Sequence, residues 1–135
     1  FVPAGAGPFP VIVYAHGNEP DPTDTIESVA PGLVARGYAV FGPHRRGAGL
    51  SAYAAPNLLR TLTAIEAREG VEARSRAAIA ALEVPQLDDV AAAVEFAKRL
   101  PAVDPERVYV AGLSFGGILA LLAAERGLGL RATAN

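Results

Sequence analysis

The chain has 135 residues, 51% of them hydrophobic and 19% charged, and its 12 Lys and Arg against 14 Asp and Glu give a net charge of −2. Such a chain is one globular domain or part of one, and it holds no apolar run of the roughly 18 residues that span a membrane. Zero cysteine excludes disulfides, thiolate metal sites and a cysteine nucleophile, and the mixed charge gives no electrostatic reason for nucleic acid or anionic lipid as a partner. The expected partner is therefore a small molecule.

Both ends of the sequence indicate a fragment. The chain contains no Met and opens with Phe1-Val2-Pro3, which reads as the middle of a longer sequence. We expect a single domain over residues 1–135 that is truncated at both ends, so a signal peptide would lie outside it. The default expectation is a soluble, cytoplasmic protein, and the oligomeric state is left open.

Short apolar runs alternate with amphipathic stretches along the chain, which is typical of strands alternating with helices. The run Pro10–Ala15 is continuously apolar, as expected of a strand covered on both faces of a parallel sheet. In chain order we predict strand 10–15, helix 24–37, strand 38–41, two short helices within 57–83, helix 87–99, strand 107–111, helix 115–126 and the start of a strand at 130–133. The predicted fold is a doubly wound, mostly parallel α/β sheet with helices on both faces.

Two of the predicted helical regions need comment. Asp24 and Glu27 resemble a capping box at the start of the first helix, and Pro31 is expected to kink or restart that helix. In the second region, Gly70 interrupts two apolar stripes. Residues 57–84 are therefore predicted to form a helical insertion, which serves either as a lid over a substrate or as plain packing.

The segment Gly112-Leu113-Ser114-Phe115-Gly116 lies between a predicted buried strand and a predicted helix. This is the nucleophile-elbow pattern, in which a serine stands on a sharp strand-to-helix turn. We expect glycine at 112 and 116 because a Cβ there would strike the neighbouring strand or helix. Ser114 would then stand at the carboxyl edge of the sheet, where α/β sheets bind their ligands.

A second segment, His16-Gly17-Asn18, follows the first predicted strand, where enzymes of this architecture take an oxyanion-hole donor. We assign the two donors to the backbone N–H groups of Asn18 and Phe115. His16 is expected to hold the loop through its ring nitrogens, with a role as general base as the weaker alternative.

Three segments in this order resemble the α/β-hydrolase superfamily, and within it the dienelactone hydrolase-like and prolyl-oligopeptidase-like branch. They are His16-Gly17, the loop Arg46-Gly47-Ala48-Gly49-Leu50-Ser51, and Val103-Asp104-Pro105-Glu106-Arg107-Val108 running into Gly112-Leu113-Ser114-Phe115-Gly116-Gly117. The resemblance covers nearly the whole chain. It implies a partial α/β-hydrolase fold and a serine hydrolase that cleaves carboxylic ester, lactone or peptide-like bonds through an acyl-enzyme on Ser114, without a cofactor.

The other two residues of a catalytic triad are missing from the expected positions. In this fold the chain order is Ser, then Asp or Glu, then His, yet the residues after Ser114 contain no Asp and no His, and Glu125 is their only acid. The resemblance places the acid and the histidine beyond Asn135. Neither His16 nor His44 matches the position of the base, so we expect the 135-residue chain alone to be inactive.

Three other interpretations fit the sequence less well. Residues 47–52 fit a dinucleotide fingerprint, with Glu66 further along, but Pro56 disfavours the helix that the fingerprint requires. With two His and no Cys, a conventional zinc site is not expected. The main alternative to an enzyme is a non-catalytic α/β-hydrolase-like domain that binds a ligand or partner.

Four charged residues in or next to these segments are expected to have mainly structural roles. The pair Arg45-Arg46 is expected to be solvated or ion-paired, with recognition of an anionic substrate group as the alternative. Asp104 and Glu106 are expected to shape the turn before the strand, at the sheet edge opposite Ser114.

Overall fold

The computed structural model describes all residues from 1 to 135 and contains four strands and five α-helices. In chain order they are β1 (Phe9–Ala15), α1 (Thr23–Val34), β2 (Ala39–Phe41), α2 (Leu58–Glu69), α3 (Val71–Ala81), α4 (Leu87–Lys98), β3 (Val103–Gly112), α5 (Phe115–Glu125) and β4 (Ala132–Ala134). The strands form one sheet in the order β2-β1-β3-β4, and every neighbouring pair is parallel. The predicted α/β class is therefore confirmed.

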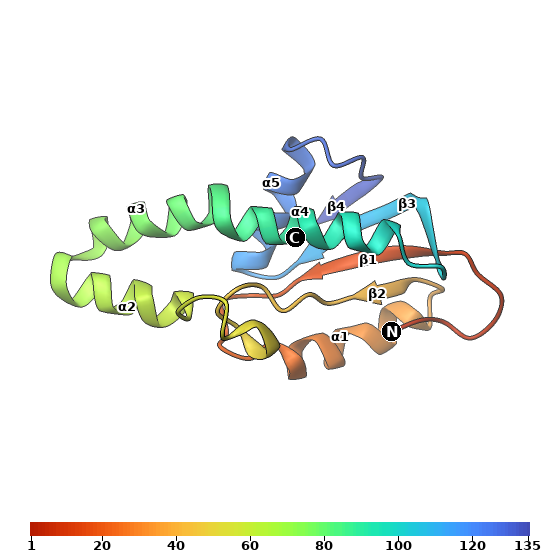
Figure 1. Cartoon of the computed structure of the whole chain (residues 1–135), viewed down its shortest axis with the longest axis horizontal. Coiled ribbons are helices and arrows are strands. Elements are labelled where there is room, and N and C mark those ends of the chain that lie inside the picture. Colours follow the sequence, from red (N-terminus) through yellow and green to blue (C-terminus); the bar gives the residue numbers. More distant parts are fainter.

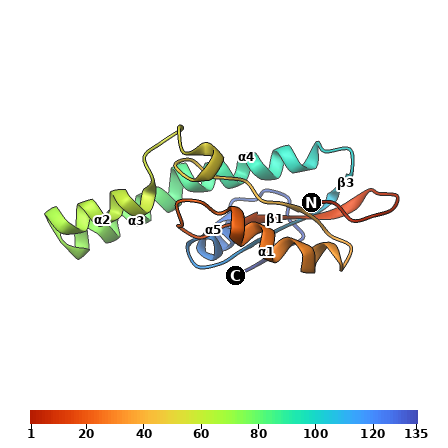
Figure 2. The same cartoon turned by 90° about the horizontal axis from the view of Figure 1, so that it is seen from below.

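Helices cover both faces of the sheet (Figures 1 and 2). Alternate residues of β1 point to opposite sides, so Val11, Val13 and Ala15 join the main core with residues of α4 and α5. Tyr14 faces the other way and packs with Ile26 of α1. Because both faces are buried, the strand reads as the uninterrupted apolar run seen in the sequence.

Helix α1 begins differently from the prediction. Its N-cap residue is Pro22, which supplies no side-chain bond, whereas the carboxylate of Asp21 accepts the Thr23 N–H at 3.0 Å. The expected capping box at Asp24 is therefore wrong. The helix also continues through Pro31 to Val34 without restarting. A proline removes one helical N–H donor, but its carbonyl can still accept a hydrogen bond, and the Pro31 carbonyl accepts the Ala35 N–H at 2.9 Å.

Helices α2 and α3 form a hairpin that extends beyond the carboxyl ends of the strands (Figures 1 and 2). The Asn57 side chain caps α2 by accepting the Arg60 N–H at 3.2 Å, and Gly70 separates the two helices with a φ of 86°. A π-helical turn, Leu82–Gln86, joins α3 to α4. No helix in the structure is both long and apolar enough to cross a membrane.

Strand β3 starts four residues earlier than the sequence predicted. Its register against β1 shifts between Val103 and Val108, so the intervening residues bulge out of the ladder. Asp104 holds this bulge, because its carboxylate accepts from the Glu106 N–H at 3.0 Å and from Arg107 Nε at 2.6 Å. These bonds also hold the pKa of the Asp104 carboxyl below its usual value.

Candidate functional site

A sharp turn joins the end of β3 to the start of α5, and Ser114 stands at its tip. Ser114 has φ 56° and ψ −122°, and it is the only residue other than glycine with a positive φ. Such a conformation is strained for an L side chain and is found where surrounding structure enforces it. The serine side chain is exposed at the carboxyl edge of the sheet.

The turn lies directly against the end of β1. A Cβ at Gly116 would collide with the carbonyl oxygens of Ala15 and His16. At Gly112, a Cβ would collide with the Gly116 carbonyl and approach the Ala15 oxygen to 2.8 Å. These contacts are with backbone atoms, so neither position can accept a side chain without a backbone shift.

Two backbone donors lie beside Ser114. The N–H groups of Asn18 and Phe115 donate no hydrogen bond within the chain. The carbonyl of Ser114 shares a peptide group with the Phe115 N–H, and it accepts from the N–H groups of Gly117 and Ile118 at 2.9 and 3.2 Å. This N–H therefore belongs to the first turn of α5, whose free N–H groups favour negative charge.

Asn18, Ser114 and Phe115 line one cleft of about 620 Å³. The structure thus brings together the three site residues that the sequence singled out from two distant segments. The cleft is also lined by residues of the α2–α3 hairpin, namely Leu59, Leu62, Arg74, Ser75, Ala78 and Ile79. Residues of the predicted insertion therefore line the same cleft as Ser114.

Arg74 is a cleft residue that the sequence did not single out. Its Nε lies 3.1 Å from the Glu66 carboxylate across the hairpin, and the side chain is 41% exposed. An arginine on the surface of a helix has no sequence pattern that would identify it as part of a functional site. Only the folding back of α3 on α2 places it near Ser114.

His16 lies buried behind the Asn18 loop and not in the cleft. Its Nε2 accepts the Arg45 N–H at 3.2 Å, and its Nδ1 lies 3.0 Å from the Gly17 carbonyl oxygen. These partners fix a neutral ring with the proton on Nδ1. Burial, together with the nearby Arg45 cation, lowers the pKa of His16 to about 3. Both ring nitrogens are engaged, as expected for a histidine that holds the loop.

Arg45 is buried with only 2% of its surface exposed. The expectation of a solvated or ion-paired arginine is therefore wrong for this residue. Its guanidinium donates to the carbonyl of His16 at 2.7 Å, to the carbonyl of Gly17 at 2.5 Å and to the Gln86 side-chain oxygen at 2.9 Å. Burial lowers the pKa of Arg45 to about 10, which still leaves it a cation at neutral pH.

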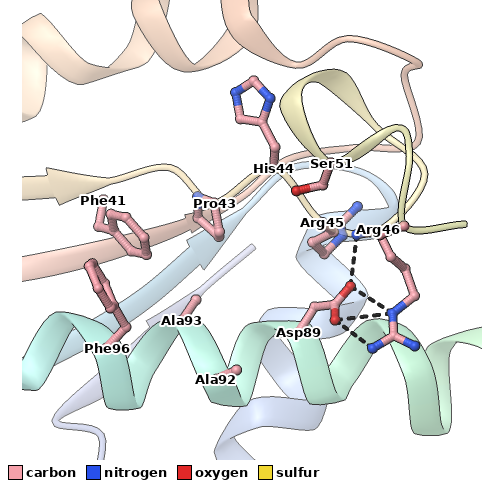
Figure 3. Close-up of a pocket in the computed structure, with 11 residues that line it drawn as sticks. Phe41, Pro43, His44, Arg45, Arg46, Ser51, Asp89, Ala92, Ala93 and Phe96 are labelled. Carbon is pink, nitrogen blue, oxygen red and sulfur yellow. Dashed lines mark hydrogen bonds and ion pairs between the residues drawn. The ribbon is translucent and has the colours of Figure 1, made fainter.

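The neighbouring Arg46 is ion-paired, as expected. Its side chain and its backbone N–H all donate to Asp89 on α4, at distances from 2.7 to 3.0 Å (Figure 3). This pair raises the pKa of Arg46 and ties the loop after β2 to α4. The two adjacent arginines therefore have different partners, since Arg45 binds the carbonyls of His16 and Gly17 and Arg46 binds Asp89.

A second cleft of about 400 Å³ lies beside this pair and shares no lining residue with the Ser114 cleft. It contains Ser51, His44 and Asp89, the residue types of a catalytic triad. Figure 3 shows the ring of His44 pointing away from Asp89. His44 Nδ1 accepts the Leu50 N–H at 2.9 Å, and Asp89 binds Arg46, so the three residues do not form a triad.

The Gly47–Ala52 segment lacks the helix that a dinucleotide fingerprint needs. Only a single 3-10 turn, Gly49–Ser51, follows the first glycine, and α2 begins later at Leu58. The His, Asp and Glu side chains form no group of three placed to hold a metal ion. The polar residues that line the Ser114 cleft are Ser114 and Ser75, Asn18 with its side-chain amide, and Arg74, and the backbone N–H groups of Asn18 and Phe115 are the donors without a partner in the chain.

Comparisons with known proteins agree with this architecture. The family model described as the dienelactone hydrolase family matches residues 1–135. The crystal structure of a protein from Klebsiella pneumoniae subsp. pneumoniae, provisionally called a dienelactone hydrolase, superposes with a TM-score of 0.64 at 18% sequence identity. That match covers 98% of this chain and 50% of the other, so the chain spans about half the length of that structure. No curated protein matches the chain.

Proposed function

Since the chain belongs to the dienelactone hydrolase family, we propose that it carries the nucleophile and the oxyanion-binding groups of a serine hydrolase. The bonds it cleaves are carboxylic esters, lactones or peptide-like amides, through an acyl-enzyme intermediate. Ser114 is the nucleophile, and the N–H groups of Asn18 and Phe115 form the oxyanion hole. Gly112 and Gly116 are the elbow glycines that allow the turn.

The observation that carries this proposal is the backbone of Ser114. A serine held at φ 56° needs surrounding structure that enforces the strain, and here the turn packs against the end of β1 with two glycine contacts too close for any side chain. Strain of this kind is concentrated at functional sites. The exposed hydroxyl then shares a cleft with two N–H donors that nothing else in the chain uses.

In the proposed reaction, Ser114 Oγ attacks the substrate carbonyl carbon as its proton passes to a general base. The carbonyl oxygen becomes an oxyanion that accepts from the Asn18 and Phe115 N–H groups. The intermediate collapses, the C–O or C–N bond breaks, and the leaving group takes the proton. Water then attacks the acyl-enzyme by the same path, which releases the acid and restores the Ser114 hydroxyl.

The base and its orienting acid are proposed to lie outside residues 1–135. Both histidines of the chain are bonded elsewhere, His16 to backbone groups behind the Asn18 loop and His44 to the Leu50 N–H. The half-length match to the Klebsiella structure is consistent with this arrangement. The ester, lactone and amide substrates named above are therefore proposed for the whole protein and not for residues 1–135 alone.

The proposal is tested in the full-length gene product by replacing Ser114 with alanine. Hydrolysis of p-nitrophenyl acetate should fall by at least about 1000-fold in Ser114→Ala, because a serine hydrolase without its nucleophile retains only background catalysis. The matched control is Ser51→Ala, since Ser51 lines the other cleft and should keep activity within about twofold. Retained activity in Ser114→Ala would refute the assignment.

The runner-up is a non-catalytic domain that binds a ligand in the same cleft. The observation in its favour is that no base within residues 1–135 hydrogen-bonds to Ser114. It predicts no esterase activity from the full-length protein and no difference between the native protein and Ser114→Ala. The same assay thus separates the two interpretations.

A further inference from the structure

Arg45 is a buried cation that forms no ion pair with a carboxylate. Its guanidinium donates to neutral oxygens, namely the backbone carbonyls of His16 and Gly17 and the side chain of Gln86, and its Nη2 also lies 3.4 Å from His16 Nδ1. Burying a charge is expensive unless its partners are well placed. Such an arrangement indicates that the guanidinium fixes the backbone of this particular loop.

The bond to Gly17 has a direct consequence for the cleft. The Gly17 carbonyl and the Asn18 N–H belong to one peptide group, and in a planar trans peptide they point in opposite directions. Arg45 Nη2 lies 2.5 Å from that carbonyl oxygen, and His16 Nδ1 approaches the same oxygen at 3.0 Å. With the oxygen held on the buried side, the N–H is turned away from Arg45, toward the side on which Asn18 lines the cleft with Ser114.

We propose that Arg45 is a positioning residue of the oxyanion hole, which holds the Gly17–Asn18 peptide with its N–H toward a carbonyl attacked by Ser114. This inference rests on the proposed function of Ser114. The bond from the cation also polarises the peptide, which makes its N–H a stronger donor to a developing oxyanion. Arg45 thereby acts on the transition state without touching the substrate.

Two further contacts hold the guanidinium itself. Arg45 Cζ lies 5.8 Å from the centroid of the Phe115 ring, the residue that supplies the second donor. Arg45 Nε donates to Gln86, which is 5% exposed and ends the π-helical turn between the α2–α3 hairpin and α4. Gln86 is therefore a second positioning residue, one step further from the reaction.

The test compares Arg45→Met with Arg46→Met in the full-length protein. Methionine keeps an unbranched side chain and removes the cation, and Arg46 is the matched control because it binds Asp89 and neither carbonyl. In Arg45→Met, kcat for p-nitrophenyl acetate should fall by about 10- to 100-fold while KM changes by less than about threefold, as for a loss confined to the transition state. Arg46→Met should keep both constants within about threefold.

A transition-state probe separates positioning from mere packing. Phenylboronic acid forms a tetrahedral adduct with a nucleophilic serine, and its inhibition constant should rise by about 10- to 100-fold in Arg45→Met. Arg45→Lys keeps a buried donor cation and should recover most of this loss. A purely structural role would lower the urea midpoint but leave kcat per fluorophosphonate-titrated site and boronate affinity unchanged, and that result would overturn the proposal.

If Arg45→Met does not fold, Gln86→Leu tests the positioning role instead, because it removes the side-chain oxygen that binds Arg45 Nε and leaves the guanidinium in place. We expect its kcat to fall by at least about threefold with KM unchanged, and an unchanged kcat would overturn the proposal. Ser114→Ala, measured alongside, keeps the two claims distinguishable. An inactive Ser114→Ala with fully active Arg45 and Gln86 variants refutes the positioning role alone, whereas an active Ser114→Ala refutes the proposed function.

Discussion

Two buried titratable residues behind the cleft differ in charge at neutral pH although burial lowers the pKa of both. The pKa of His16 falls to about 3 and that of Arg45 to about 10. Burial disfavours the charged form of each, but arginine starts so high that it remains a cation at pH 7, whereas histidine becomes firmly neutral. The loop that carries Asn18 is therefore held by one neutral ring and one cation at every physiological pH.

The neutral state of His16 makes the stability of the protein depend on pH. The unfolded chain takes up a proton near pH 6.5 and the folded chain only near pH 3, so between these values the free energy of unfolding decreases as the pH falls. The expected slope is about 1.4 kcal/mol per pH unit. Urea unfolding at pH 7.0, 5.5 and 4.5 measures it.

The control for this prediction is a pair of glutamine variants. In His16→Gln the amide can replace both ring hydrogen bonds without titrating, so the slope between pH 6.5 and 4.5 should become much smaller. His44→Gln should retain the native slope, because His44 lies in another loop and its ring accepts a hydrogen bond from the Leu50 N–H, which a glutamine side-chain oxygen can also accept. Equal slopes in the native protein and His16→Gln would show that His16 is protonated in the folded state.

At the scale of elements, the site depends on how closely the turn before α5 approaches the end of β1. Gly116→Ala should destabilise the fold by about 3 kcal/mol or more, because the new Cβ collides with two backbone carbonyls that cannot move aside. Gly32→Ala in α1 is the matched control. Its Cβ meets nothing closer than Arg36 Nη1 at 3.7 Å, and alanine should stabilise the helix by about 0.5–1 kcal/mol.

Urea unfolding of the two glycine variants at pH 7 checks this prediction. A Gly116→Ala protein as stable as the native one would mean that the turn does not pack on β1 as described. The account of why glycine stands at this position would then fail, whatever the activity of the variant.

Most elements could be predicted from the sequence because each carries a local periodic signal. The apolar run of β1 and the spacing of α4 gave boundaries within one residue of those observed. The start of β3 was missed because Asp104-Pro105 reads as a turn, although a bulge lets the strand pass through it. The start of α1 was predicted incorrectly because the carboxylate that accepts the Thr23 N–H belongs to Asp21, which lies before the helix.

At the scale of the whole molecule, the cleft is assembled from three separate parts of the chain. The segment around Ser114 and the Asn18 loop could be predicted because each carries a short motif next to a buried strand. Arg45 and Gln86 could not, because the carbonyls that Arg45 binds lie 28 and 29 residues away and Gln86 lies 41 residues away. Their roles depend on tertiary packing alone.

The proposed assignment of a nucleophile without a base to residues 1–135 leads to a prediction for this chain on its own. Expressed as residues 1–135 and shown to be folded by circular dichroism, it should hydrolyse p-nitrophenyl acetate no faster than its own Ser114→Ala variant. The reason is that a nucleophile without a base loses most of its catalytic power. Turnover that depends on Ser114 in this isolated chain would show that residues 1–135 already contain the base.

The central claim, that Ser114 is the nucleophile, is tested most directly by labelling the full-length protein with a fluorophosphonate and mapping the adduct by peptide mass spectrometry. The account predicts one phosphonyl group per molecule, on the Ser114 hydroxyl, and no adduct in Ser114→Ala. An adduct on another residue, or no adduct on a folded protein that hydrolyses esters, would contradict it.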